Sequence, residues 1–337
     1  MFMLIGLKRV AIAFGVLLVL LVVLLRLQGW QYLAAYSGAG FANPLPDTSR
    51  FAATANQQCN AEPLRVMSFN VMYGSAVIEA LAARFRGGST GVGELPWSVR
   101  LPEIRARIAS YSPDLLGLQE MGENSAVDAV APPELYTLVS YHLGGFQYGD
   151  SALLFKTARF EQLASGQLWL GNTPELPMSL GFQPLSMVRY ANWAWLRDKA
   201  SGFTFLFVNS HFDNAGANKE PSASLFRERI TRLARNIPMV VTGDFNTTAD
   251  TERYRRFSGI DAKPPLLENA YTLAGSPAVA AALHPDRRID HILAGGPCGV
   301  VAEQWLLDTR PLKNGQMMSD HDALFASLRF FAKPVGK

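Results

Sequence analysis

The stretch VVTGDFNTT, residues 240–248, ends a run of apolar residues with an aspartate and an asparagine two positions apart. Side chains alternate along an extended strand, so Asp244 and Asn246 are expected on one face, with Phe245 on the other. Together they would present one carboxylate and one amide to a single reacting atom. The same residue types are common in turns, so this stretch alone does not establish a chemical role.

Five further apolar segments carry polar residues of similar type at or near one end. They are Asn70 in VMSFN, Glu120 in LLGLQE, His211 and Asp213 in FLFVNSHFD, Asp290 in RRIDHIL, and Asp320 with His321 in MSDHDA. Each residue has an ordinary explanation as a turn former, a helix cap or a buried histidine. Their repetition at the ends of apolar segments favours one shared site.

Oxygen donors dominate this set, and no cysteine belongs to it. Carboxylates and amides favour Mg²⁺, Mn²⁺ or Ca²⁺ over zinc, because hard cations take oxygen ligands. Two histidines can donate hydrogen bonds to phosphoryl oxygens, and an aspartate beside each can fix its tautomer. A cation, two histidines and an aspartate that holds water suit the hydrolysis of a phosphate ester. A Ser-His-Asp hydrolase is not supported, because no serine lies in a G-x-S-x-G turn.

The elements that must position these residues follow from the apolar pattern. Helical spacing predicts helices at 97–111 and 222–236, and a short arginine-rich helix after the segment that begins at Val240. Besides that segment, the pattern predicts strands at 64–71, 114–120, 135–142, 152–156, 188–197, 203–211, 287–295, 300–307 and 323–330. Many strands with interspersed helices predict an α/β fold of two packed sheets flanked by helices.

The N-terminal region has a different character. Residues 10–25 are uninterrupted apolar sequence preceded by Lys8 and Arg9, the charge order of an export signal or an inside-facing anchor. We favour an uncleaved single-pass anchor at residues 1–33, a linker at 34–63 and a catalytic domain at 64–332 on the extracytoplasmic side of the cell membrane. Cleavage in the small-residue stretch LAAYSGA, followed by secretion, is the alternative.

Charge and cysteine content limit the possible partners. Without the four basic and one acidic residues of 1–50, the remainder holds 27 of each sign and is formally neutral. Dedicated nucleic-acid binders usually carry a basic excess, so tight nonspecific binding of long DNA is not supported. Cys59 and Cys298 lack metal-binding spacing, and the sequence leaves open whether they form a disulfide.

The ordered motifs SFN, LQE, SHFD, GDFN, RIDHIL and SDH resemble the endonuclease/exonuclease/phosphatase superfamily, the metal-dependent phosphoesterases related to DNase I, exonuclease III and neutral sphingomyelinases. The resemblance spans residues 65–328. It implies a four-layer α/β/β/α sandwich of two mixed β-sheets between helices, with the site at the strand ends. It also implies that Glu120 ligates a catalytic Mg²⁺, with Asn70 and Asp320 near it and with Mn²⁺ as a possible substitute.

The catalytic residues that the resemblance implies are His211, Asp244, Asn246, Asp290 and His321. Asp244 would orient or deprotonate the attacking water, with Asn246 beside it. The two histidines would contact the scissile phosphate, and Asp290 would hold His321. Asp150, in YGDSALLF, and Asp213 are candidates for a supporting role.

These features predict a metal-dependent hydrolase of phosphate esters, of the phosphodiesterase or endonuclease kind, that acts outside the cytoplasm. A sphingomyelinase-like lipid phosphodiesterase and a phosphomonoesterase are the alternatives. The substrate would be a nucleic acid or a phospholipid head group, and the N-terminal helix would provide the contact with the membrane. A membrane-tethered domain that only binds its ligand is a further hypothesis, and the sequence indicates no obligate protein partner.

Overall fold

Strand β1, Leu64–Gly74, is buried along almost its whole length, because it lies in the middle of a sheet that is covered on both faces. The structure is a computed structural model that describes residues 13–21, 59, 62–76, 79–80, 95–143, 146–175, 179, 181–183, 186–275 and 288–333. A continuous apolar run is the pattern expected of such a strand. β1 therefore forms part of the core as well as carrying site residues.

The first sheet has six strands in the order β11-β12-β1-β2-β4-β3. The partners of β1 are β2 (Leu115–Met121), β3 (Tyr136–Leu143), β4 (Phe146–Lys156), β11 (Gly299–Asp308) and β12 (Ala323–Phe331). β1 and β2 are parallel, whereas β12 is antiparallel to β1. The carboxyl ends of β1 and β2 and the amino end of β12 consequently lie at one edge.

The second sheet also has six strands, in the order β5-β6-β7-β8-β10-β9. They are β5 (Phe160–Trp169), β6 (Tyr190–Asp198), β7 (Thr204–His211), β8 (Met239–Asp244), β9 (Glu268–Asn269) and β10 (Asp290–Gly295). β7 and β8 are parallel, and β10 is antiparallel to β8. This arrangement repeats that of the first sheet, so both sheets bring the same kinds of strand end to the same edge.

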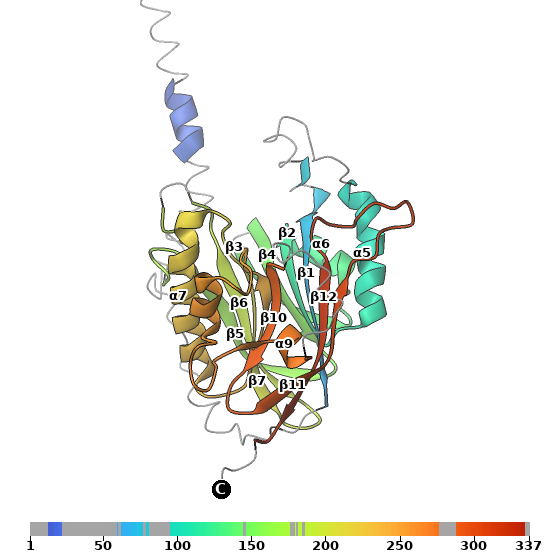
Figure 1. Cartoon of the computed structure of the whole chain (residues 1–337). Helices are drawn as coiled ribbons and strands as arrows, with labels where there is room; N and C mark the ends of the chain where they lie inside the picture. Colours follow the sequence, from blue (N-terminus) through green and yellow to red (C-terminus); the bar gives the residue numbers. More distant parts are fainter. Residues whose placement is uncertain are drawn as a thin grey trace, which may run out of the picture.

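Helices cover the two outer faces (Figure 1). The first sheet is covered by α5 (Trp97–Tyr111) and α6 (Asn124–Val130), and the second by α7 (Gly216–Ala234) and α8 (Glu252–Ser258). A further short helix, α9 (Ala270–Leu273), packs against β10 and β11. One buried apolar cluster lies between the sheets and one beneath each helical layer. The two mixed sheets of the expected sandwich are therefore present.

A buried polar network joins the two sheets in their interior. Asn209 of β7 donates from Nδ2 to Leu118 O and Ala152 O, at 3.0 and 2.8 Å, and its Oδ1 accepts from Gln119 Nε2 at 2.7 Å. A Cβ on Gly117 would lie 2.4 Å from Asn209 Oδ1, so only glycine permits this approach. Because buried polar groups are costly to leave unpaired, the network fixes how the sheets face each other.

Most predicted elements lie close to their expected positions, and the differences have local causes. α7 begins at Gly216, before the predicted start at residue 222. Asp213 Oδ1 accepts from Ala215 N at 2.9 Å, and its Oδ2 accepts from Asn218 Nδ2 at 2.6 Å. These bonds stabilise the first turn ahead of Pro221. Strand β5 and helix α6 were not anticipated.

Within the described residues, no helix has both the length and the apolar character needed to span a membrane. The predicted anchor falls mostly outside those residues, although 13–21 form a helix within it. Most of the predicted linker also lies outside the described part of the chain.

Cys59 and Cys298 form a disulfide with their Cα atoms 5.5 Å apart, which answers the question that the sequence left open. The bond joins the segment before β1 to the residue before β11, across a sequence separation of 239 residues. Both side chains are buried in the cluster between the sheets. The N-terminal end of the domain is thus tied to its C-terminal half.

Reduction of this disulfide should lower stability, because a cross-link over so long a loop restricts the unfolded chain by about 4 to 5 kcal/mol in the entropic model. We expect dithiothreitol to lower the melting temperature of the wild-type chain. The variant Cys59→Ser/Cys298→Ser should melt at the reduced wild-type temperature and should not respond to the reductant. An unchanged melting temperature in reduced wild-type protein would contradict a stabilising role.

Candidate functional site

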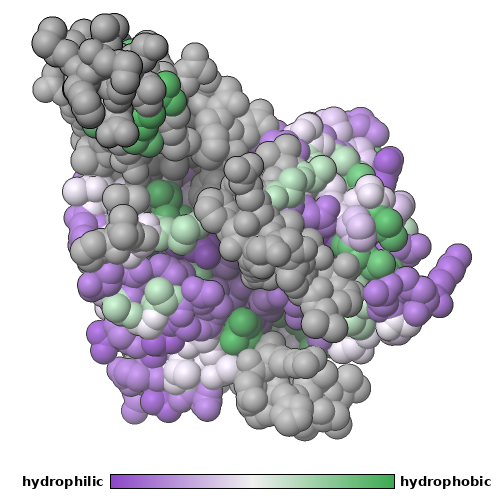
Figure 2. Space-filling view, turned by 90° about the horizontal axis from the view of Figure 1, so that it is seen from above, coloured by the Kyte–Doolittle hydropathy of each residue, from purple (hydrophilic) through white to green (hydrophobic). Residues whose placement is uncertain are grey.

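The two sheets bring the predicted residues to one edge through their strand pairing. His211 and Asp244 end the parallel strands β7 and β8 and are paired in register. Asp290 begins β10 and is paired with Asp244 from the other side. Viewed from this end, hydrophilic residues line the hollow in the middle of the described surface (Figure 2). The site therefore lies at the strand ends, where loops leave the sheets.

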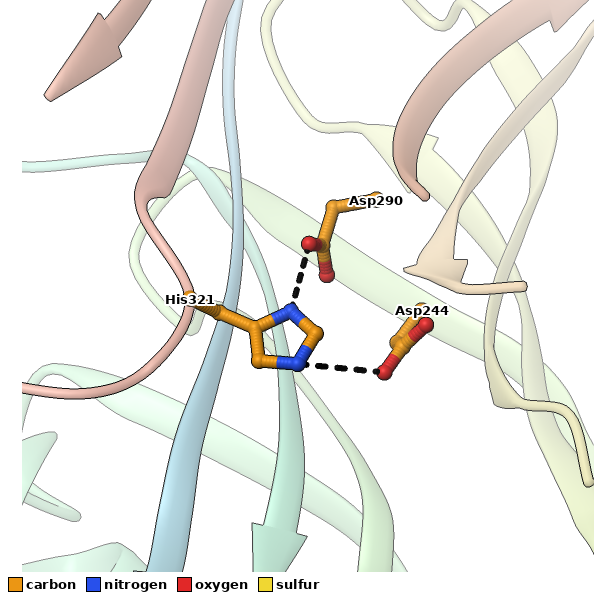
Figure 3. Close-up of side chains that lie close together, drawn as sticks. All are labelled: Asp244, Asp290 and His321. Atoms are coloured by element: carbon orange, nitrogen blue, oxygen red, sulfur yellow. Dashed lines mark hydrogen bonds and ion pairs between the residues drawn. The ribbon is translucent and has the colours of Figure 1, made fainter. Parts of the chain in front are cut away.

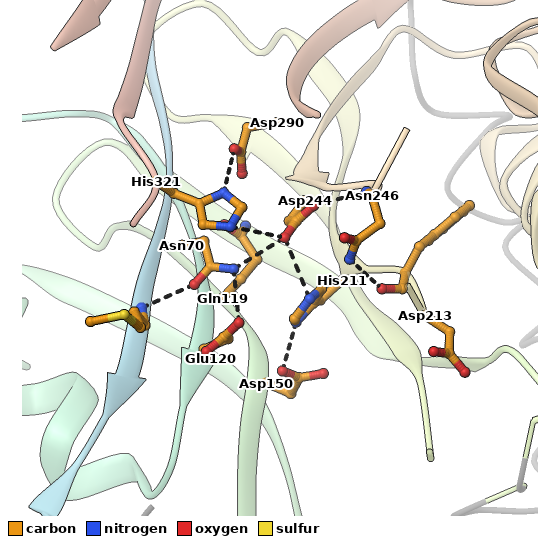
Figure 4. A network of polar contacts seen from close by, with 12 residues as sticks. Asn70, Gln119, Glu120, Asp150, His211, Asp213, Asp244, Asn246, Asp290 and His321 are labelled. Carbon is orange, nitrogen blue, oxygen red and sulfur yellow. Dashed lines mark hydrogen bonds and ion pairs between the residues drawn. The ribbon is translucent and has the colours of Figure 1, made fainter. Parts of the chain in front are cut away.

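Asp244 lies at the centre of this site, and the residue is 1% exposed. Its Oδ2 accepts from Asn70 Nδ2 at 3.1 Å and lies 3.5 Å from His211 Nε2 and 3.7 Å from His321 Nε2 (Figure 4). Burial, followed by the nearby charge of Asp290, raises the pKa of Asp244 above its ordinary value. A carboxylate with a raised pKa is a better proton acceptor near neutral pH.

His211 is held by a second buried carboxylate. Its Nδ1 lies 2.8 Å from Asp150 Oδ1, and Asp150 Oδ2 accepts from Arg189 Nη1 at 2.6 Å. Burial and the charge of Arg189 act to lower the pKa of His211, but the charge and hydrogen bond of Asp150, together with the charge of Asp244, raise that pKa overall. Burial would raise the pKa of Asp150, but Arg189 and His211 hold it well below its ordinary value. Asp150 thus lies in the network and keeps Nε2 of His211 directed at Asp244.

His321 has an equivalent partner from the other sheet. Its Nδ1 lies 2.7 Å from Asp290 Oδ2, so its Nε2 faces Asp244 (Figure 3). Burial would lower the pKa of His321, but the charges of Asp290 and Asp244 outweigh it and raise that pKa to about 10. The imidazole is therefore positively charged at neutral pH and can donate a hydrogen bond to an anion.

Asn70 and Glu120 form the oxygen-rich side of the site. Asn70 Nδ2 donates to Glu120 Oε1 at 3.2 Å as well as to Asp244, so one amide bridges two carboxylates. This donor set fits a hard divalent cation. Donor atoms of Asp244, Asp290 and His321 also lie within 4.8 Å of one another, which is a second possible arrangement. The positive charge on His321 would repel a cation there, so Glu120 with Asn70 is the better fit.

The backbone around these two residues is unusual. Strand β1 has a bulge between Asn70 and Gly74, and within it Met72 and Tyr73 have φ values of 52° and 49°. The bulge directs Met72 N to Asn70 Oδ1 at 3.0 Å and Tyr73 N to Glu120 Oε2 at 3.2 Å. Left-handed residues other than glycine are strained and persist only where the surroundings hold them.

Arg100 of α5 holds this bulge. Its guanidinium donates to Val71 O at 2.6 Å, Met72 O at 2.7 Å and Met318 O at 3.0 Å, and the residue is 1% exposed. Met318 lies three residues before His321, so one side chain fixes the segments on both sides of the site. Ser319 adds a second link, since its hydroxyl donates to Asn70 O at 2.7 Å.

The side chains of three predicted residues make no contact with the central carboxylate among the described residues. β8 ends at Asp244, so the alternation expected of an extended strand does not reach Asn246, which has a φ of 50°. Its backbone N–H donates to Asp244 Oδ1 at 2.8 Å, and its side chain donates from Nδ2 to Phe212 O at 2.9 Å. Asp213 stabilises the start of α7. Asp320 is exposed, its carboxylate accepts from the neighbouring Ser319 hydroxyl at 3.3 Å, and its charge contributes to the raised pKa of His321.

Sequence reasoning missed Arg100 and Arg189, both of which act on other site groups. Arg189 lies within the predicted strand 188–197, and directly before the observed start of β6 at Tyr190. An arginine at such a position does not by itself identify the carboxylate that it contacts. Arg100 lies on a predicted helix at a position that the apolar spacing of Ile104 and Ile108 places on the inner face. That location is the one signal in the sequence for its burial.

We expect Arg100→Met to loosen the bulge and weaken binding of a divalent cation by about 10- to 100-fold, the usual effect of losing an outer partner of a metal site. Calorimetric titration with Mn²⁺ measures the affinity, and a thermal melt shows whether the variant is folded. Arg105→Met is the matched control, because Arg105 is an exposed arginine on the same helix. Unchanged Mn²⁺ affinity in folded Arg100→Met would contradict the role given to Arg100.

Known proteins share this architecture. A crystal structure of an endonuclease/exonuclease/phosphatase family protein from Bacteroides thetaiotaomicron matches 81% of this chain and 100% of its own, with a TM-score of 0.62 and 23% identity. A mannosyl-6-phosphatase from the same species covers 79% of this chain and 99% of its own, with a TM-score of 0.61 and 23% identity. At sequence identities this low, the structural similarity establishes a common fold and does not by itself establish a common activity.

The catalytic domain of human Nocturnin, solved with a bound sulfate anion, covers 80% of this chain and 96% of its own, with a TM-score of 0.57 and 24% identity. No match was found among curated protein sequences. The model of the Endonuclease/Exonuclease/phosphatase family matches residues 67–321, a range that contains every side chain of the central cluster. This chain belongs to the endonuclease/exonuclease/phosphatase family.

Proposed function

We propose that this chain hydrolyses phosphate esters with the help of a bound Mg²⁺ or Mn²⁺ ion. The observation that carries the proposal is the convergence of two histidines on one buried carboxylate. His211 Nε2 and His321 Nε2 face Asp244 Oδ2 at 3.5 and 3.7 Å, and each ring is held on its far side by an aspartate. Membership of the family supports phosphoester hydrolysis as the reaction class.

The positively charged and the negatively charged residues have different roles in this proposal. His321, and His211 with its raised pKa, donate hydrogen bonds from Nε2 to the phosphoryl oxygens, where negative charge increases in the transition state. Asp244 holds the attacking water and accepts its proton, for which its raised pKa suits it. Asp150 and Asp290 fix the ring orientation and stabilise the positive charge.

Glu120 and Asn70 are the residues that would hold the cation, because they supply a carboxylate and an amide oxygen beside Asp244. When bound, the cation supplies electrophilic stabilisation of a phosphoryl oxygen. Asn70 then keeps Glu120 and Asp244 apart at a fixed spacing, since its amide contacts both carboxylates. The Arg100-held bulge keeps that spacing constant while substrate enters and leaves.

Two solved structures of this fold are described with different kinds of phosphate ester. One is described as a mannosyl-6-phosphatase, and another, TDP2 of D. rerio, is described as complexed with a single-strand DNA product. Residues 51–337 are formally neutral, which favours a compact substrate over a long polyanion.

The full chain, purified in detergent, should hydrolyse p-nitrophenyl phosphate or bis-p-nitrophenyl phosphate when Mg²⁺ or Mn²⁺ is present. EDTA should abolish turnover, and added metal should restore it. Asp244→Asn should lower kcat by about 10² to 10⁴, the usual cost of losing a general base, because it keeps shape but removes the proton acceptor. Asp261→Asn, at an exposed aspartate, is the matched control.

Activity that survives complete metal removal would contradict the role of the cation. Folded Asp244→Asn that retains more than about a tenth of wild-type kcat would remove Asp244 from the mechanism, since a loss of less than tenfold is smaller than the usual effect of losing a general base. Absence of turnover on nucleic acids, phospholipids and sugar phosphates as well would overturn the proposed reaction.

We propose further that the domain lies outside the cytoplasm on a chain that keeps its apolar N-terminal segment. The disulfide between Cys59 and Cys298 supports this location, because such bonds persist in oxidising compartments. The apolar run at 10–25 after Lys8 and Arg9 supports anchorage.

An anchored chain should stay with membranes through a carbonate wash, because burial of an apolar segment is not ionic. Mass spectrometry of the membrane fraction should find the N-terminal residues 1–29 still attached. Soluble protein that begins between Ala34 and Phe41 would show cleavage instead.

A further inference from the structure

A pocket of about 490 Å³ lies beside the catalytic cluster, on the side of β10, β11 and α9. Asp290 belongs to its wall and at the same time accepts from His321 at 2.7 Å, so one side chain separates the pocket from the cluster. A pocket of this size accommodates a small organic group. Its position suits the part of a substrate that is attached to the reacting phosphate.

One wall of the pocket is apolar and aromatic. Tyr271 and Trp305 meet edge to face, with ring centroids 5.2 Å apart, and Leu307 and Leu324 extend the apolar surface. Arg288 lies over the Tyr271 ring at 5.2 Å from its centroid. Because one ring face is covered and the two rings are not parallel, the wall does not form a slot in which a flat base could be sandwiched.

The remaining wall is rich in carboxylates. Asp250, Asp290 and Asp322 line the pocket, and Arg288 is the one arginine or lysine among its described lining residues. His291 also lines it, but burial lowers the pKa of this histidine to about 4, so it is neutral near pH 7. Three acidic groups against one basic group repel a second phosphate, which disfavours a polynucleotide or a polyphosphate in this space. Carboxylates accept hydrogen bonds, so several of them suit a neutral ligand that carries several hydroxyl donors. The pocket thus combines a flat apolar wall with acceptors for hydroxyl groups.

We propose that this pocket takes a neutral, hydroxyl-rich ring, a sugar or a cyclic polyol, that is esterified to the phosphate cleaved at the catalytic cluster. The apolar face of the ring packs on Tyr271 and Trp305, and its hydroxyl groups donate to the carboxylates. Arg288 donates to hydroxyl oxygens from the same wall. This assignment rests on the proposed phosphoesterase function and specifies its substrate class.

The test compares two substrates on the full-length protein with Mg²⁺. One is a hexose 6-phosphate or an inositol phosphate, and the other is butyl phosphate, which has neither ring nor hydroxyl group. Methyl diesters of the same compounds replace them if the chain cleaves only diesters. Tyr271→Leu and Asp322→Asn should each lower the ratio of kcat/KM for the ring substrate to that for butyl phosphate by about tenfold, the usual scale for one lost specificity contact.

Tyr111→Leu is the matched control, because Tyr111 also carries an arginine over its ring, Arg310 at 5.8 Å, but lies outside the pocket. Its substrate ratio should equal that of the wild type.

An unchanged ratio in the two pocket variants would overturn the assignment, as would a selective loss on nucleoside monophosphates. Wild-type turnover of butyl phosphate without preference for any ring substrate would also overturn it while leaving the proposed function intact. No turnover of any ester would instead count against the function itself.

Discussion

The site depends on one constraint, the need to satisfy a carboxylate that is buried where the two sheets meet. Asp244 is reached by Asn70 and His321 from one sheet and by His211 from its own. Each of these contacts costs desolvation, and together they compensate the buried charge. The same contacts hold the sheets at a fixed separation at this edge, so folding and chemistry use one set of interactions.

The two histidines are supported differently, and this gives the site two unequal halves. His211 is almost wholly enclosed and shares Asp150 with Arg189, which opposes its protonation. His321 is more exposed and has Asp290 as its partner without a competing arginine in the described contacts. The protonated form is therefore more strongly stabilised in His321 than in His211. The segment that leads to His321 is also held by Arg100, whose guanidinium donates to the backbone carbonyls of Met318 and Val71.

Sequence reasoning reached the elements whose pattern is regular. The helix at Trp97–Tyr111 was predicted at its observed bounds because Ile104 and Ile108 repeat at helical spacing. Strand β5 was missed because, as an edge strand, its burial does not alternate cleanly. The contact between Asp150 and His211 joins residues 61 positions apart. Only the family resemblance made Asp150 a candidate for a supporting role, because residue spacing alone does not show such a pairing. Arg100 acts through carbonyl groups, which every residue has, so no motif marks its partners.

The disulfide has a mechanical consequence. Cys59 lies five positions before Leu64, the first residue of β1, and the site residue Asn70 lies about 20 Å along that strand from Leu64 at the usual rise per residue. When a force acts between the chain before Cys59 and the chain after Cys298, the shortest covalent path runs through the disulfide into β11, and β1 lies outside that path. Tension on the N-terminal segment therefore ends at a covalent bond, and the strained bulge that orients Asn70 and Glu120 is shielded from it.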